Sequence, residues 1–127
     1  MWKRCTSALI PVVVSGALLA PVAQASCVPF TAAQQRARAN VIFEGVALEG
    51  PTQTGVQRFR VTRYLKNSGP RVVRVKTGTT ERADGTGMTT SVSLYVKRGD
   101  RWRIFARGSV RKVMTSGLCD GSRKLTR

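Results

Sequence analysis

The sequence predicts a small all-β domain closed by a disulfide bond, and three observations carry this prediction. Five segments are rich in β-forming residues, and most of them alternate apolar with charged side chains, which is typical of strands with one buried face. Turn residues separate these segments, which follow one another at intervals of about 10–15 residues. Two cysteines stand near the two ends of the chain that remains after a predicted export signal is removed. Together these observations favour a small barrel or a sandwich.

The first 25 residues have the features of a cleaved signal peptide. A short basic start precedes an apolar run over residues 8–20. Small residues then end the segment, so we expect signal peptidase to cleave between Ala25 and Ser26. The apolar run of about 13 residues is shorter than the about 20 that cross a bilayer, which disfavours a retained membrane anchor. Residues 26–127 are therefore predicted to form one domain that is secreted or held in the periplasm or cell envelope, with no membrane span.

Cys27 and Cys119 are the only cysteines of this predicted mature chain, because Cys5 lies in the signal peptide. In an oxidising compartment such a pair most simply forms a disulfide bond. The bridge would close a loop of about 90 residues and stabilise the fold by a few kcal/mol. The alternative is two buried free thiols. Two cysteines in a chain without histidine are a poor ligand set, so no metal and no cofactor are predicted.

The elements are predicted in the following order. Thr31 and Gln34 have the form of a capping box, which indicates a short helix through about Arg38. The predicted strands cover residues 39–48, with a bulge or bend at Gly45, then residues 56–65, 71–77, 88–97 and 101–107. Residues 78–87 contain three glycines and predict a mobile loop, and Gly99-Asp100 predicts a tight hairpin turn between the last two strands. The chain from residue 108 onward is predicted to be irregular or to hold one last short element.

The charge of the chain suggests an acidic partner. Removing Lys3 and Arg4 with the signal peptide leaves 20 of the 22 basic residues against six acidic ones, a net charge of +14. Arginine dominates, and its planar guanidinium suits phosphate, sulfate and carboxylate groups. The alternative is that this charge only solvates a small surface.

Catalysis is disfavoured by the residue types available. The chain has no histidine, which removes the usual general base and the usual activator of a nucleophile. No two of the six acidic residues form a close pair in sequence, and no glycine-rich phosphate loop lies between a strand and a helix. We therefore expect a protein that is not an enzyme.

Basic residues that alternate with the predicted core positions form the candidate polyanion-binding site. We expect them to share strand faces, with one aromatic side chain interleaved among the arginines of the last strand. These candidates are Arg58, Arg60, Arg63, Arg74, Lys76, Arg101, Arg103, Phe105 and Arg107. Phe43, Phe59, Val61 and Trp102 are assigned to the core instead. The alternative is a solvated outer face with one apolar residue left exposed.

Several segments resemble the tissue-inhibitor-of-metalloproteinases-like, or netrin-module-like, domains. The resemblance begins at Cys27 and continues through VIFEG at 41–45, FRV at 59–61, YLK at 64–66, VRVKTG at 73–78, WRIFA at 102–106 and TSGLCDG at 115–121. It covers nearly all of the mature chain. It implies a five-stranded Greek-key OB-type barrel with a short N-terminal helix and a C-terminal segment tied by the Cys27–Cys119 bridge.

The chain departs from the family pattern at its start. Family members often begin with Cys-x-Cys, and in the inhibitors the amine and carbonyl of the first cysteine chelate the zinc of the protease. Here the triplet is Ala25-Ser26-Cys27, and the family's cysteine before the fourth strand is also missing from residues 89–93. Chelation by Ser26 beside Cys27 would use only backbone atoms, but a terminus without its own disulfide is usually mobile.

The leading functional expectation is thus an exported, non-catalytic binding module for an acidic protein, polyanion or surface. Export makes an intracellular nucleic acid an improbable partner. Metalloprotease inhibition through the mature N-terminus is one alternative. A structural envelope protein whose charge serves only solvation is the other. The sequence does not indicate an oligomeric state.

Overall fold

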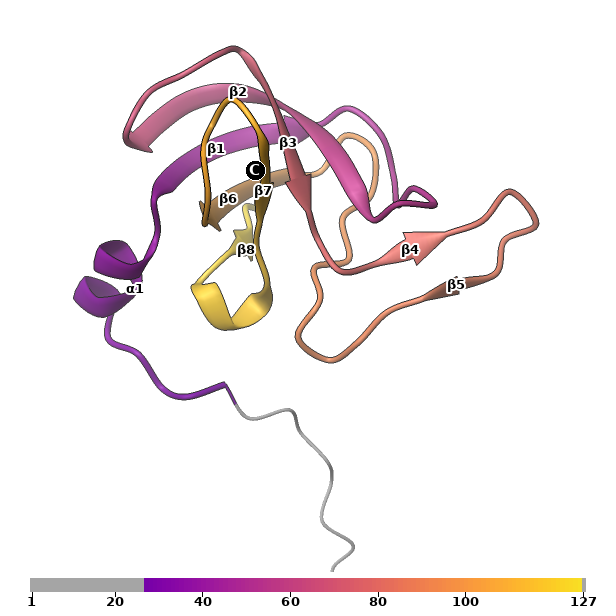
Figure 1. The fold of residues 1–127 in the computed structure, drawn as a ribbon, viewed down its shortest axis with the longest axis horizontal. Helices are drawn as coiled ribbons and strands as arrows, with labels where there is room; N and C mark the ends of the chain where they lie inside the picture. The colour runs from indigo at the N-terminus through magenta and orange to yellow at the C-terminus, as the bar shows by residue number, and fades with distance from the viewer. Residues whose placement is uncertain (1–26, 127) are drawn as a thin grey trace, which may run out of the picture.

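A computed structural model describes residues 27–126, so the predicted signal peptide and the cleavage site between Ala25 and Ser26 lie outside the described residues. The chain forms a short helix followed by a mostly β structure (Figure 1). The elements are α1 (Ala32–Arg38), β1 (Val41–Ala47), β2 (Val56–Lys66), β3 (Val72–Lys76), β4 (Thr80–Glu81), β5 (Gly87–Met88), β6 (Arg101–Ala106), β7 (Val113–Thr115), the 3-10 helix η1 (Leu118–Asp120) and β8 (Arg123–Lys124).

The capping box predicted for the helix is confirmed. The Thr31 hydroxyl accepts a hydrogen bond from the Gln34 backbone N–H at 3.2 Å, and the Gln34 side-chain carbonyl accepts one from the Thr31 N–H at 2.9 Å. Both bonds satisfy N–H groups that the first turn leaves unpaired. The helix ends at Arg38, and Ala39 returns the chain to an extended conformation that leads into β1.

Six strands form one curled sheet in the order β7-β3-β2-β1-β6-β8. Neighbouring strands are antiparallel except β3 and β7, which are parallel. The long β2 strand bends around β1 with register shifts on either side of Phe43 and Glu44. At the second shift a Cβ on Gly45 would lie 2.8 Å from the Arg60 carbonyl oxygen, so only glycine allows this close approach. The bulge predicted at Gly45 is confirmed.

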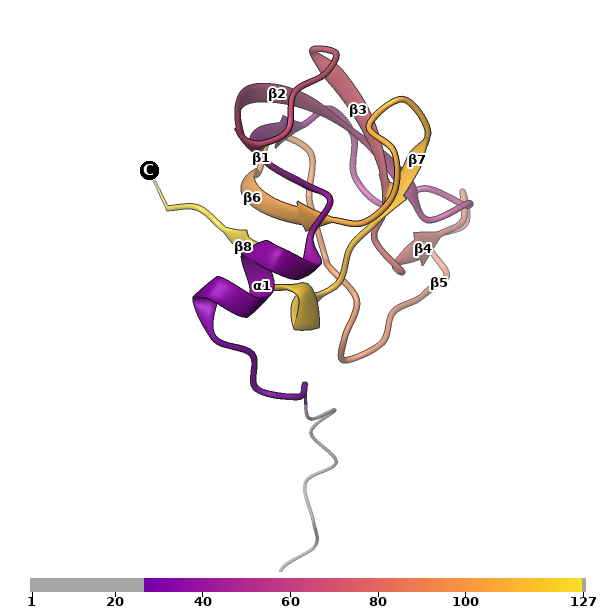
Figure 2. The same cartoon turned by 60° about the vertical axis from the view of Figure 1, so that its left-hand side comes forward.

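The two sides of the sheet come together where β6 ends. Arg107 and Thr115 exchange backbone hydrogen bonds of 2.9 and 3.0 Å, which join the end of β6 to β7. Because β7 also pairs with β3, the sheet curls into a half-barrel, and Figure 2 shows this curl with α1 below it.

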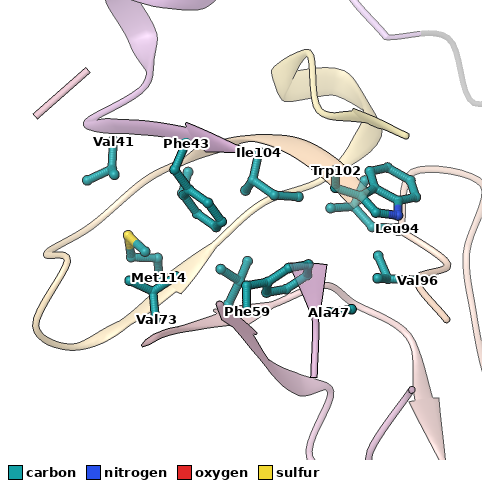
Figure 3. Close-up of a cluster of buried hydrophobic side chains, with 12 residues drawn as sticks. Val41, Phe43, Ala47, Phe59, Val73, Leu94, Val96, Trp102, Ile104 and Met114 are labelled. Carbon is teal, nitrogen blue, oxygen red and sulfur yellow. The ribbon is translucent and has the colours of Figure 1, made fainter. Parts of the chain in front are cut away.

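The core fills the inside of this curl. Phe43 and Ile104 from β1 and β6 face Phe59 and Met114 from β2 and β7, and all four side chains are fully buried (Figure 3). The rings of Phe43 and Phe59 meet edge to face with centroids 5.9 Å apart, an arrangement that adds to the apolar burial. The predicted core positions Phe43 and Phe59 are confirmed, and Trp102 is buried with them.

The strand predicted over residues 88–97 is wrong. Of this segment only Met88 belongs to a strand, and its side chain is exposed, although Leu94 and Val96 are fully buried. The Ser93 N–H donates to the Thr90 carbonyl at 3.1 Å, and the two hydroxyl groups of these residues are 2.7 Å apart. Such local bonds from Ser and Thr compete with a strand ladder. The segment therefore crosses the end of the half-barrel as an irregular chain that inserts two apolar side chains.

The segment predicted as a mobile loop over residues 78–87 instead contains part of a two-stranded ribbon. β4 pairs with β5 in antiparallel register, and the ribbon projects from one side of the molecule (Figure 1). The predicted turn at Gly99-Asp100 is present, with Gly99 at a φ of +86° and the Asp100 N–H bonded to the Lys97 carbonyl at 3.1 Å. It joins β6 to an irregular segment rather than to a strand.

The Cys27–Cys119 disulfide is confirmed, with 5.1 Å between the two Cα atoms. It ties the segment before α1 to η1, near the C-terminal end. The bond therefore links the two end regions of the described chain covalently.

Candidate binding surface on the outward face of the sheet

Basic side chains alternate with core residues along neighbouring strands. Because successive residues of a strand point to opposite sides, burying Phe59 and Val73 turns the residues beside them outward. We call the outward cations Arg58, Arg60, Arg74, Lys76 and Arg101 the basic face, and all five are exposed. Five of the nine predicted candidates thus belong to the basic face.

Like charges lie directly opposite one another in the basic face. Arg58 on β2 pairs in register with Arg74 on β3. Directly opposed like charges are unfavourable in a sheet. Glu49 offsets part of this repulsion, because its carboxylate accepts hydrogen bonds from the Arg58 guanidinium at 3.2 and 3.3 Å and from the Arg58 backbone N–H at 3.1 Å. The remaining four cations of the basic face form no ion pair within residues 27–126.

A second arrangement surrounds Glu44 in the middle of β1. Its in-register neighbours are Arg63 on β2 and Arg103 on β6, so an arginine flanks the carboxylate on each side. Glu44 is only 7% exposed. Its Oε1 accepts a hydrogen bond from the Arg63 Nε at 2.6 Å and a longer one from Arg103 at 3.4 Å. The bond from Arg63 is the main reason that the pKa of Glu44 lies below its usual range, although burial opposes the shift.

Beside Glu44 a groove of about 440 Å³ opens between α1 and the outward face of the sheet. We call it the α1 groove. It is lined by Arg36, Ile42, Arg63, Leu65, Lys66, Arg103 and Phe105. The Lys66 ammonium donates to the Arg36 carbonyl at 2.7 Å, which links β2 to the last turn of the helix.

The structure corrects the expectation that Phe105 is an exposed aromatic among arginines. Phe105 is 8% exposed and packs with Ala39 and Ile42 in a small cluster separate from the main core. The turn from α1 into β1 covers this part of the outward face, which the strand pattern alone does not reveal. Phe105 contributes to the lining of the α1 groove rather than to an exposed stacking surface.

Three further predicted residues lie apart from the basic face. Arg107 is at the junction of β6 and β7, where its guanidinium pairs with Asp120 at 3.0 Å. Cys27 is exposed at its disulfide. Ser26, the candidate contact to a protease, lies outside the described residues.

Sequence reasoning missed the α1 groove, because Arg36, Leu65 and Lys66 were not among its candidates. Their proximity depends on the end of α1 lying beside the end of β2, which no local pattern records. One signal was present: Glu44 is the only charged residue in the apolar strand VIFEGVA. A buried carboxylate requires cationic partners, so this residue could have indicated where two arginines converge.

Residues 27–126 contain no group of three or more Cys, Asp or Glu side chains that could hold a metal ion. In the same part of the chain, no helix is long and apolar enough to cross a membrane. No protein-family model matches the chain, and no match is found among curated proteins or among solved structures.

Proposed function

We propose that the chain is an exported, non-catalytic binding module built on an OB-type barrel, and that its basic face binds an acidic polymer or surface. The strand connections support the barrel type. β1, β2 and β3 form an antiparallel meander, β7 joins β3 in parallel, and β6 pairs with β1. Counting β6 and β7 as the fourth and fifth strands, these pairings support the proposal of a five-stranded Greek-key barrel.

The observation that carries the proposed function is the regular array of exposed cations on the basic face. Neighbouring strands lie about 4.8 Å apart, and outward residues of one strand repeat at about 6.7 Å. Several cations can therefore contact successive anionic groups of one polymer at the same time. Glu49 is the one acidic side chain that pairs with a member of the basic face among residues 27–126.

The test is the salt dependence of binding to heparin and to double-stranded DNA. If the basic face binds through phosphate or sulfate contacts, affinity falls steeply between roughly 50 and 200 mM salt, and for DNA the logarithmic slope is about −0.9 per phosphate contact. The variants Arg60→Ala and Lys76→Ala should each weaken binding and reduce that slope by about one contact.

Arg111→Ala is the matched control, because Arg111 is also an exposed arginine and lies outside the sheet. Its removal should change affinity much less than removal of Arg60. Equal effects of all three variants would mean that only total charge matters. Absence of binding at low salt would favour the structural alternative, in which the charge only solvates the surface.

A further inference from the structure

We infer that the α1 groove is a separate site for a small amphiphilic anion, that is, a phosphate or carboxylate group carried on an apolar stem. This inference goes beyond the basic face and stands even if that face binds no polymer. It rests on three features of the groove: its size, its excess of cations and the apolar residues among them.

The size of the groove fits a small molecule. Its volume of about 440 Å³ lies within the range of roughly 300–1,000 Å³ that is usual for ligand pockets. Its lining comes from Arg36 of α1 and from side chains of β1, β2 and β6. The basic face is instead a regular outward array, which suits a repeating polymer.

The charge of the groove selects an anion. Arg36, Arg63, Lys66 and Arg103 line it, and Glu44 behind them neutralises only one of these four charges. Both arginine contacts converge on the same carboxylate oxygen of Glu44. The Arg103 Nε is buried and has no hydrogen-bond acceptor among residues 27–126. The guanidinium groups thus keep donor capacity that a phosphate or carboxylate can use.

The apolar lining selects the stem. Ile42 and Phe105 belong to the small apolar cluster on the outward side of the sheet, and both line the groove. Leu65 lies next to Lys66, and its apolar side chain is 43% exposed among mainly charged residues of the groove. An apolar stem that covers Leu65 would gain free energy from burial, whereas a simple inorganic anion would leave this surface in water.

The test compares ligands that share one head group. Calorimetric titration with octyl phosphate, below the concentration at which it forms micelles, should show a single saturable site. Its affinity should exceed that of inorganic phosphate at least tenfold, which burial of about two methylene groups supplies. Octanol should bind no better than inorganic phosphate, because it lacks the charge. If octyl phosphate binds no more tightly than inorganic phosphate, the inference is wrong.

Substitutions locate the site. Leu65→Ser should lower the affinity for octyl phosphate at least threefold without changing that for inorganic phosphate, and Lys66→Gln should lower both. Arg74→Gln, which removes an exposed charge from the basic face, should leave octyl phosphate binding unchanged while weakening heparin binding. Unchanged octyl phosphate affinity in both groove variants would overturn the inference, and thermal unfolding of each variant checks that the fold is retained.

Vesicles distinguish the two sources of such a ligand. If the anion is a lipid head group, phosphatidylglycerol vesicles should bind the protein, phosphatidylcholine vesicles should not, and Leu65→Ser should weaken the binding. If octyl phosphate binds but Leu65→Ser leaves vesicle binding unchanged, the ligand is a free amphiphile. Heparin binding that persists when the groove variants lose octyl phosphate shows that the two sites are independent.

Discussion

The basic face and the surroundings of Glu44 lie on the same side of the same sheet, but arginine has different neighbours in each. In the basic face, Arg58 and Arg74 oppose each other, and the acidic partner Glu49 keeps 31% of its side chain exposed. Around Glu44, two arginines converge on a carboxylate that is almost completely buried. The two acids therefore differ both in burial and in the number of arginine partners.

The physical reason is the change in solvation. Exposed ion pairs contribute about 0–1 kcal/mol, because water screens them and the side chains lose freedom on pairing. A buried carboxylate has lost its water and depends on the donors around it, so removing the charge or a partner has a larger effect. Glu44 and Glu49 allow a buried and a more exposed acid to be compared within one chain.

The largest expected effect is that of Glu44→Gln on stability. Replacing the carboxylate removes the charge-assisted hydrogen bonds from Arg63 and Arg103, so we expect the free energy of unfolding to fall by about 2 kcal/mol. Glu49→Gln, which removes the exposed partner of Arg58, should cost less than about 1 kcal/mol. Denaturant unfolding of both variants with the disulfide intact measures the difference. Equal losses would show that burial of the acid does not distinguish the two regions.

Glu44 should contribute to the pH dependence of stability. The Arg63 hydrogen bond holds the folded-state pKa of Glu44 below its ordinary value of 4.5, so the unfolded chain binds more protons in acid. This contribution is fully present above about pH 5 and is lost as the pH falls through the lowered folded-state pKa. Unfolding free energies measured from neutral pH to about pH 3 should therefore decline less steeply in Glu44→Gln than in the wild type.

The difference between the wild-type and Glu44→Gln pH profiles checks this assignment. The Asp84 carboxyl also has a lowered pKa, because the Thr86 hydroxyl and N–H donate to it, but this contribution is the same in the wild type and in Glu44→Gln. Subtracting the pH profile of Glu44→Gln from that of the wild type therefore removes the contribution of Asp84. A Glu44→Gln profile parallel to that of the wild type would contradict the role given to Arg63.

The sequence predicts most of the fold where local pattern and burial agree. The alternation around Phe59 and Val73 is sufficient to place β2 and β3, and the capping box is sufficient to place α1. It fails over residues 88–97, where Leu94 and Val96 alternate as in a strand but are buried without a neighbouring strand to pair with. Alternation of apolar residues indicates that one face of a segment is buried. It does not indicate whether the backbone forms hydrogen bonds with a neighbouring strand.

The candidate site is predicted less well, because its parts are distant in sequence. The exposed arginines of the basic face follow from alternation alone. The α1 groove does not, since Arg36 and Arg103 line it together only because α1 ends beside the sheet and β1 pairs with β6. Phe105 shows the same limit: its strand position indicates an outward side chain, but the chain before β1 covers it.

The smallest effect, and the one of opposite sign, is expected for Arg74→Thr in the basic face. This change removes the like charge opposite Arg58 and introduces a β-branched residue on an exposed strand position, so it should stabilise the protein by a few tenths of a kcal/mol. Arg60→Thr is the control, because it makes the same change in side chain and charge. Arg60 lies opposite Val72 and Val46, so its replacement relieves no directly opposed pair of like charges. The advantage of Arg74→Thr over Arg60→Thr should shrink in about 1 M salt, where the screening length falls to about 3 Å. A difference that salt leaves unchanged would assign the effect to packing and strand preference, and the repulsion between Arg58 and Arg74 would then have no measurable part in the stability of the basic face.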